Sequence, residues 1–216
     1  MAWPTGAVPG IDVSHYQAVI DWPTVQSAGV AFGFAKASEG ESSSDLYFVD
    51  NWSGMKAAGI LRGAYHFFHP ARDPQAQVNR FLQQLAKANG DSVVLAAGDL
   101  PAALDIEVTD GIAVPAVMAG AMAWLMAVEA ATERRPIVYT YTNFWNNTLG
   151  NPSDLSGYPL WISYLNVTTP ILPSAWPNWI FWQFAQQPLT GVPSVSVDLD
   201  VFNGTEPELQ TIAGYA

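Results

Sequence analysis

Segments of strand length alternate with segments of helical spacing over the first 150 residues, and this alternation constrains the fold more than any other feature. Apolar runs predict strands over residues 9–14, 30–37, 61–68, 100–107 and 137–141. Each run is followed by a predicted helix, over residues 21–29, 45–58, 73–89, 115–135 and 142–149. Because strands joined by helical crossovers run parallel, we expect a parallel sheet.

The pattern changes after residue 150. Three further strands are expected over residues 159–163, 180–184 and 195–201, but the segment 166–178 holds five Pro or Asn residues and no amphipathic helix. Eight strands of this kind predict an α/β fold, a modified TIM barrel with five strand–helix units followed by three strands with few helices. No long charged or low-complexity linker divides the chain, so we expect one domain over residues 1–216.

Two of the helices carry specific expectations. The helix over residues 45–58 should bury the face that holds Leu46, Val49 and Trp52. The helix over residues 115–135 should end with Arg134 and Arg135, whose charges suit the negative end of the helix dipole. Its uncharged stretch is short for a bilayer and rich in Ala, which predicts a buried helix rather than a membrane span.

Composition narrows the classes of function. Half of the residues are hydrophobic and 12% are charged, which suffices for a large core and argues against disorder. The net charge of −11 argues against nucleic-acid partners and against an anionic membrane surface. Cysteine is absent, so neither disulfides nor thiolate chemistry contribute. The nine Trp and eight Tyr suit a sugar-binding cleft, since their flat faces match those of pyranose rings. We expect a monomer without a metal or other cofactor.

Two carboxylates stand at the end of the fourth expected strand. Side chains alternate along a strand, so Asp105 and Glu107 point to the same side. Two acids at this spacing, about 6.6 Å along the backbone, share one small volume, and one of the two pKa values should rise. This arrangement suits acid/base chemistry. An acidic pair at a strand end can also simply cap a following helix or solvate a loop.

Other polar residues fall at the ends of different strands. In TIM barrels the active site lies at the carboxyl ends of the strands, so these side chains should converge in one pocket. The converging residues are Asp12, Lys36, Asp105, Glu107, Tyr141 and Asp198. Their convergence from distant segments favours a catalytic site.

Several segments resemble the motifs of the glycoside hydrolase family 25 lysozymes, the Chalaropsis-type muramidases. The matching segments are Gly10–Gln17, Phe34–Gly40, Gly63–Phe67, Ala103–Glu107, Trp182–Phe184 and Val197–Phe202. The resemblance implies a barrel of five strand–helix units and three strands. It also implies cleavage of the β-1,4 bond between N-acetylmuramic acid and N-acetylglucosamine in peptidoglycan.

The resemblance also implies roles for individual residues. Glu107 would be the general acid, and Asp105 would stabilise the transition state or the acetamido group of the substrate. Asp12 and Asp198 would line the same acidic site. The candidates for holding sugar or orienting carboxylates are Lys36, Tyr65, Tyr139, Tyr141, Trp161 and Gln183.

One position departs from the family, which commonly has Asn where this chain has Asp200. An inward-facing Asp200 would add a negative charge, and our hypothesis is that it raises the pKa of Glu107 and moves the activity optimum upward. In the alternative, Asp200 turns outward and caps a helix.

The sequence leaves the mechanism open. Carboxyls about 5–5.5 Å apart indicate a retaining glycosidase and about 6.5–9.5 Å an inverting one, and an i, i+2 pair spans both ranges. Because no separate nucleophile stands out, we favour assistance by the substrate's N-acetyl group.

Three other functions compete with this one. A zinc amidase needs three converging ligands, yet the only histidines are His15, His66 and His69, and the last two would point to opposite faces of a strand. We expect His66 to be a core residue, or one that supports the residues of the site from behind, hydrogen-bonded within the barrel. The second competing function is a non-catalytic glycan-binding barrel, and the third is a wall-degrading component of a larger assembly.

The N-terminus lacks the features of a signal peptide, which suits a phage endolysin released by a holin or a trimmed secreted enzyme acting on the cell wall.

Overall fold

Eight strands close into a barrel in the computed structural model, which describes residues 3–4 and 6–215. The first strand of the barrel pairs with both the second and the last, which closes the sheet. The strands are β1 (Val8–Val13), β2 (Phe32–Glu39), β4 (Leu61–Phe67), β5 (Ala103–Asp105), β6 (Ile137–Tyr141), β7 (Leu160–Ser163), β8 (Phe181–Gln187) and β9 (Val197–Phe202). A two-residue strand, β3 (Ser43–Ser44), extends the edge beside β2. The expected modified TIM barrel is confirmed.

The direction of β9 differs from the expectation of a parallel sheet. β9 runs antiparallel to both β8 and β1, whereas the other barrel strands run parallel. The connection from β8 to β9, residues 188–196, has no helix, and a parallel crossover needs about a dozen residues or more. The short loop therefore forces the chain to return in the opposite direction.

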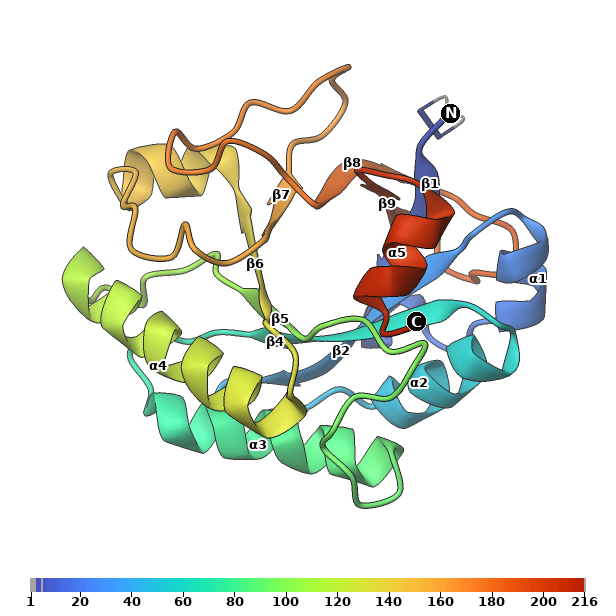
Figure 1. The fold of residues 1–216 in the computed structure, drawn as a ribbon, viewed down its shortest axis with the longest axis horizontal. Coiled ribbons are helices and arrows are strands. Elements are labelled where there is room, and N and C mark those ends of the chain that lie inside the picture. The colour runs from blue at the N-terminus through green and yellow to red at the C-terminus, as the bar shows by residue number, and fades with distance from the viewer. Residues whose placement is uncertain (1–2, 5, 216) are drawn as a thin grey trace.

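Helices cover the first part of the barrel and loops cover much of the rest (Figure 1). The helices are α1 (Trp22–Ser27), α2 (Phe48–Ala57), α3 (Pro74–Ala88), α4 (Val114–Thr132) and α5 (Glu206–Ile212), with a 3-10 turn η1 (His15–Gln17) and a π-helical turn η2 (Phe144–Thr148). Side chains cap two of these helices as their sequences suggest. The Asp21 carboxylate accepts from the backbone of Thr24, and the Asp73 carboxylate accepts from the backbone of Gln75.

Two details of the helix predictions were wrong. Leu46 is 78% exposed, because α2 begins only at Phe48, after a turn in which Asp45 accepts from the backbone of Tyr47. α4 ends at Thr132, because Glu133 adopts a left-handed conformation at the C-cap. Arg134 and Arg135 therefore lie beyond the helix, where they donate to backbone carbonyls of Ile212 and Gly157 respectively.

Helix α4 is buried on one face only. It packs against α3, and its buried side chains include Trp124, Leu125 and Val128, while Met126 on the other face is 60% exposed. The helix is long and apolar enough to cross a membrane by length and composition alone, and one-third of its most apolar window is buried. The many alanines raise its hydropathy without adding large side chains to the exposed face.

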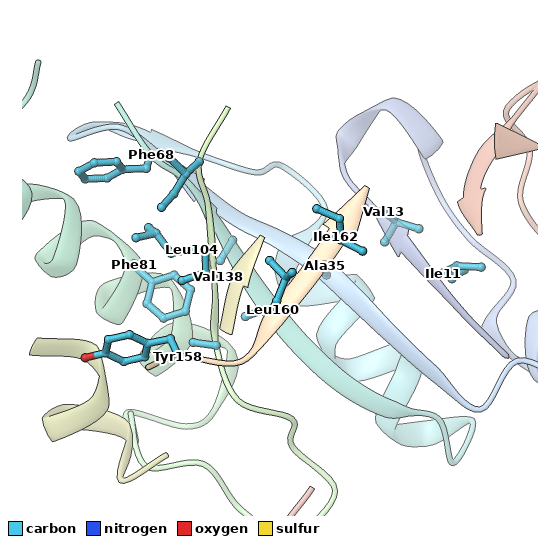
Figure 2. Packing of buried hydrophobic residues seen from close by; sticks show 14 of the residues in the cluster. Ile11, Val13, Ala35, Phe68, Phe81, Leu104, Val138, Tyr158, Leu160 and Ile162 are labelled. Carbon is cyan, nitrogen blue, oxygen red and sulfur yellow. The ribbon is translucent and has the colours of Figure 1, made fainter. Parts of the chain in front are cut away.

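The sheet separates two cores. Outward-facing strand residues such as Val13, Leu104 and Ile162 pack toward the helices together with Phe81 of α3 (Figure 2). Inward-facing residues form a second core inside the barrel. This inner core is mainly aromatic toward the end of the barrel that helix α5 closes, and its members include Phe32, Phe34, Trp161, Phe181 and Phe202.

Two inward-facing glycines make room for these rings. A side chain at Gly10 would meet the ring of Phe32 at 2.2 Å, and one at Gly63 would meet the ring of Phe34 at the same distance. Helix α5 closes the end of the barrel below the rings, since Leu209 belongs to this inner core. Access to the interior is therefore from the other end, where the parallel strands finish.

Candidate active site

A pocket of about 430 Å³ opens at the carboxyl end of the parallel strands. This volume lies in the range of small-ligand sites. Each of the eight barrel strands contributes a side chain, and Glu107 lies two residues beyond the end of β5. Every site residue expected from the sequence lines it except Tyr141: Asp12, Lys36, Tyr65, Asp105, Glu107, Tyr139, Trp161, Gln183 and Asp198. Tyr141 packs against Phe144 instead, although burial and then the charge of Glu107 raise its pKa.

Asp198 reaches the pocket by an unexpected route. It is the second residue of β9, so it lies near the amino end of its strand. Because β9 runs antiparallel to β1, this end lies at the pocket, and Asp198 stands opposite Asp12 in the register. The predicted convergence is therefore present, but the reversal of one strand produces it.

Two β-bulges set which residues of β2 and β8 face inward. The register of β8 against β9 shifts between Gln183 and Ala185. Gln183 and Gln186 consequently both face the pocket, where their side-chain amides donate to Asp12 (2.7 Å) and Asp198 (3.0 Å). The register of β2 against β4 shifts between Lys36 and Ser38, so this bulge changes the facing of the residues that follow Lys36. Lys36 itself faces inward by regular alternation with Phe34.

Asp105 and Glu107 form a coupled acidic pair. Burial is the main cause that raises the pKa of each, and for Asp105 the charge of Glu107 is the next cause. The charge of Lys36 opposes both shifts. Oδ1 of Asp105 is buried and accepts no hydrogen bond from the described residues. The two carboxyls titrate as a unit, so the pair retains a proton at pH values where free carboxyls have lost theirs.

A chain of hydrogen bonds joins this pair to Asp12. The Tyr139 hydroxyl interacts with Glu107 and also lies 2.9 Å from Oε1 of Gln183. Oε1 of Gln183 also accepts from Ser163, and its amide nitrogen donates to Asp12. Gln183 is thereby held in one orientation and fixes the Asp12 carboxyl. Tyr139 and Gln183 thus contact the carboxyls of Glu107 and Asp12 respectively.

Lys36 is held from the rim of the pocket. Its Nζ lies 2.6 Å from Oε2 of Glu39 and above the ring of Phe67. Glu39 also contacts His69, which in turn contacts Asp110. Partial burial lowers the pKa of His69, but these two carboxylates outweigh it and raise the pKa overall. The network keeps one ammonium group beside four carboxyls.

Asp200 lies beneath the pocket and faces inward, so the outward-capping alternative is wrong. Its side chain is 0% exposed, and Nε1 of Trp161 donates to its Oδ1 at 2.8 Å. Its charge acts on Asp12, whereas the main influences on the pKa of Glu107 are burial, Tyr139, Asp198 and Lys36. Asp200 is not among these influences, so the hypothesis that it raises the pKa of Glu107 has no direct contact to support it.

The histidines do not form a metal site among the described residues, where no group of three or more potential ligands converges. His66 is buried, but its ring points outward from the barrel, toward Trp124 of α4 and Gln77 of α3, and contacts Ser38. The expected buried, hydrogen-bonded core residue is confirmed, but it lies on the helix side of the sheet rather than inside the barrel, because residue 66 alternates with the inward-facing Tyr65. His69 lies in the loop after β4.

Sequence reasoning missed part of the pocket lining. The additional residues are Ser14, Tyr16, Gln17, Phe67, Gln186, Ser194, Val195 and Ser196. Ser14 and Gln17 form a capping box around η1, a signal that the sequence does carry. Gln186 could not be found by strand alternation, because the β8 bulge changes its face. The other residues lie mainly in loops.

Comparisons with known proteins agree with this geometry. The sequence profile of glycosyl hydrolases family 25 matches residues 11–191. Lysozyme M1 of Streptomyces globisporus is 34% identical over 97% of this chain and 72% of that protein. N,O-diacetylmuramidase of Arthroderma benhamiae is 29% identical over 96% of this chain and 87% of that protein.

Solved structures show the same relationship. The crystal structure of a bacterial lysozyme from Streptomyces coelicolor superposes with a TM-score of 0.87 at 33% identity. The superposition covers 97% of this chain and 98% of that one. With the profile match over most of its length, this chain belongs to the glycosyl hydrolases of family 25.

Proposed function

We propose that this glycoside hydrolase cleaves the β-1,4 bond between N-acetylmuramic acid and N-acetylglucosamine in bacterial peptidoglycan. The observation that carries the proposal is the coupled Asp105–Glu107 pair, which retains a proton within a pocket of sugar-binding size. The names of the similar lysozyme and diacetylmuramidase support the choice of substrate.

In the proposed reaction Glu107 is the general acid. It is less buried than Asp105 and lies nearer the solvent, where a glycosidic oxygen can reach it. Glu107 gives its proton to that oxygen as the bond to C1 of the muramic acid breaks. The Tyr139 hydroxyl, which donates to Gln183 in the structure, then turns its proton toward the Glu107 carboxylate that remains.

Asp105 acts on the acetamido group of the same sugar. The acetamido oxygen attacks C1, and Asp105 takes up or stabilises the proton and positive charge that develop on the nitrogen. Water, deprotonated by Glu107, then opens the cyclic intermediate at C1. Because C1 is attacked twice, the β configuration is retained. NMR of the first product should show the β anomer, and an α anomer would exclude this route.

Replacing the general acid separates catalysis from binding. Glu107→Gln keeps the shape of the side chain but cannot cycle a proton, so we expect clearing of cell walls to fall by about 10³-fold. Binding to insoluble peptidoglycan should persist. The matched control is Glu206→Gln, an exposed acid at the opposite end of the barrel, which should clear walls normally.

The same experiment tests the non-catalytic alternative. A wild-type protein that binds walls but never clears them would favour a glycan-binding barrel and contradict the hydrolase proposal. We further propose that residues 1–216 form one catalytic domain that acts on the cell wall as a monomer. Light scattering during gel filtration checks the oligomeric state.

A further inference from the structure

Two large apolar side chains stand exposed at the mouth of the acidic pocket. Tyr16 is 76% exposed and Val195 is 90% exposed, and both line the pocket. Apolar side chains scattered singly over a surface need no explanation. Two of them at the entrance of a pocket instead indicate a surface that a ligand covers.

Tyr16 and Val195 belong to one flank of the mouth. Tyr16 lies in η1 just after β1, and Val195 lies in the loop just before β9, the strand that pairs with β1 (Figure 1). Around the closed sheet, β9 is four strands away from β5 in both directions. Since Glu107 follows β5, this flank faces the proposed general acid across the mouth.

A buried carboxylate holds the turn that carries Tyr16. The side chain of Asp45, in the turn before α2, is 0% exposed. Its Oδ2 accepts from the backbone of His15 at 2.8 Å and lies 3.0 Å from Nδ1 of the same residue, while Oδ1 accepts from the backbone of Tyr47. The His15 ring packs against the Tyr16 ring with centroids 4.1 Å apart. Because the ring is already held in place, a ligand that covers it has little conformational freedom to remove.

The polar side chains of the flank carry no charge. Oε1 of Gln17 accepts from the backbone of Ser14 at 2.9 Å, and its amide nitrogen has no hydrogen-bond partner among the described residues. This amide can therefore donate to a ligand. Asp12 and Asp198 lie on the two strands that lead to the flank and would repel an anionic group there. A flat ring beside an uncharged donor suits a neutral sugar, with an apolar face and polar edges.

We propose that Tyr16, together with Val195 and Gln17, forms a separate subsite for the N-acetylglucosamine that precedes the muramic acid at the cleaved bond. This inference rests on the proposed hydrolysis of peptidoglycan. The muramic acid fills the pocket with its C1 toward Glu107, so the sugar on its other side reaches the opposite flank. That sugar is N-acetylglucosamine, since the two sugars alternate, and it carries no charge. Its ring stacks on Tyr16, and Asp45 is a positioning residue that acts through His15.

Binding of two small ligands to Glu107→Gln tests the subsite. The probes are N-acetylmuramic acid and the disaccharide N-acetylglucosaminyl-β-1,4-N-acetylmuramic acid, titrated by NMR. The disaccharide should bind several-fold more tightly than the monosaccharide. Adding Tyr16→Ala should raise the Kd of the disaccharide by about ten-fold, the scale of one well-placed aromatic contact, and leave that of the monosaccharide unchanged.

Two further variants control this measurement. Tyr16→Phe keeps the ring and should retain the affinity for the disaccharide. Tyr215→Ala removes an exposed tyrosine beside α5, at the other end of the barrel, and should change neither Kd. An unchanged Kd of the disaccharide in Tyr16→Ala would overturn the proposal. Equal losses for both ligands would also overturn it, because Tyr16 would then shape the pocket rather than a separate subsite.

The subsite and the hydrolysis can fail separately. In the active enzyme, Tyr16→Ala should raise KM for peptidoglycan fragments several-fold with little change in kcat, the pattern of a contact made equally before and during the reaction. Hydrolysis with an unchanged KM in Tyr16→Ala would keep the proposed function and contradict the subsite. A loss of binding confined to the disaccharide would support the subsite even if the wild type hydrolyses nothing.

The positioning role of Asp45 has its own test. Asp45→Ala removes the acceptors for His15, so the turn is released and the disaccharide should bind more weakly, with the monosaccharide unaffected. Thermal melting measures any loss of folded protein. His15→Ala, at a half-exposed position, removes the ring that supports Tyr16 and should have the same selective effect. Disaccharide binding as in the parent Glu107→Gln protein in both variants would contradict the positioning role.

Discussion

Two groups of buried charge lie on opposite sides of the same sheet, and they are built differently. On the helix side of β4, Arg62 and Asp99 form an ion pair at 2.7 Å with side chains only 4% and 2% exposed. The remaining guanidinium nitrogens donate to the carbonyl of Trp52 and the side chain of Asn89, and the guanidinium stacks on the Trp52 ring. Each charge in this group has a partner of opposite sign or a hydrogen bond.

The acidic pocket inside the barrel lacks this balance. Four carboxyls line it with Lys36, whose ammonium pairs with Glu39 at the rim. Burial raises the pKa of each of the four carboxyls, and Oδ1 of Asp105 accepts no hydrogen bond from the described residues. A balanced buried pair serves the fold, whereas unbalanced acids that keep protons can serve catalysis.

Breaking the balanced pair should have the largest effect on stability. Asp99→Ala leaves the Arg62 charge buried without its partner, so the free energy of unfolding should fall by about 3–5 kcal/mol. Urea denaturation measures this loss, and the protein that remains folded should keep its kcat. The double variant Arg62→Met/Asp99→Leu should lose less than Asp99→Ala. A double variant that is less stable than the single one would show that the pair itself, rather than the stranded charge, dominates.

Removing one acid from the pocket should show the opposite pattern. Asp105→Asn should lower kcat/KM by about 10²–10³-fold, because the group proposed to stabilise the transition state is lost. The urea midpoint should stay the same or rise, since one of two repelling carboxyls is gone. Asp91→Asn, an exposed acid, is the matched control for both measurements. A large loss of stability in Asp105→Asn would contradict the contrast drawn with Asp99.

His66 is a third kind of buried titratable group, because its side chain is neutral in the folded protein. Burial is the main cause that lowers its pKa to about 4, so between pH 6.5 and 4 the unfolded chain binds a proton that the folded protein does not. This group alone should therefore cost stability as the pH falls through that window, by about 3 kcal/mol at most. The raised carboxyl pKa values act in the opposite direction.

A substitution isolates the contribution of His66 to the pH dependence of the unfolding free energy. His66→Asn retains a hydrogen-bonding side chain for Ser38 or Gln77 but cannot be protonated. The difference in unfolding free energy between wild type and this variant should shrink as the pH falls from 6.5 to 4. A constant difference over that range would show that His66 takes up its proton in the folded protein as readily as in the unfolded chain, which contradicts the lowered pKa.

The smallest expected effect concerns the single ammonium group of the pocket. Lys36 lowers the pKa values of Asp105 and Glu107, so Lys36→Met should raise both and move the pH–activity profile upward by about half to one pH unit. Lys56→Met, an exposed lysine on α2, provides the control. A profile that keeps its wild-type position would remove Lys36 from the electrostatics of the site.

Local patterns in the sequence predicted much of the barrel. The strand over residues 137–141 has the predicted bounds, because a proline precedes it and polar residues follow it. The acids at positions 12, 105 and 107 meet as expected, since parallel strands bring their carboxyl ends together.

Features that depend on pairing between strands could not be predicted in this way. The antiparallel direction of β9 and the bulge at β8 follow from the closure of the sheet, and they decide how Asp198 and Gln186 reach the pocket. The hydrogen bond from Gln183 to Asp12 joins residues near the two ends of the chain. Helix α5 was also missed, although Thr205 and Glu208 form a capping box at its start.

The central claim is that acids brought together from distant strands cleave one glycosidic bond in peptidoglycan. Mass spectrometry of fragments released from purified peptidoglycan tests this claim most directly. We predict new reducing ends of N-acetylmuramic acid, formed by the wild type and not by Glu107→Gln. Reducing ends of N-acetylglucosamine, or free peptides with intact glycan strands, would contradict it.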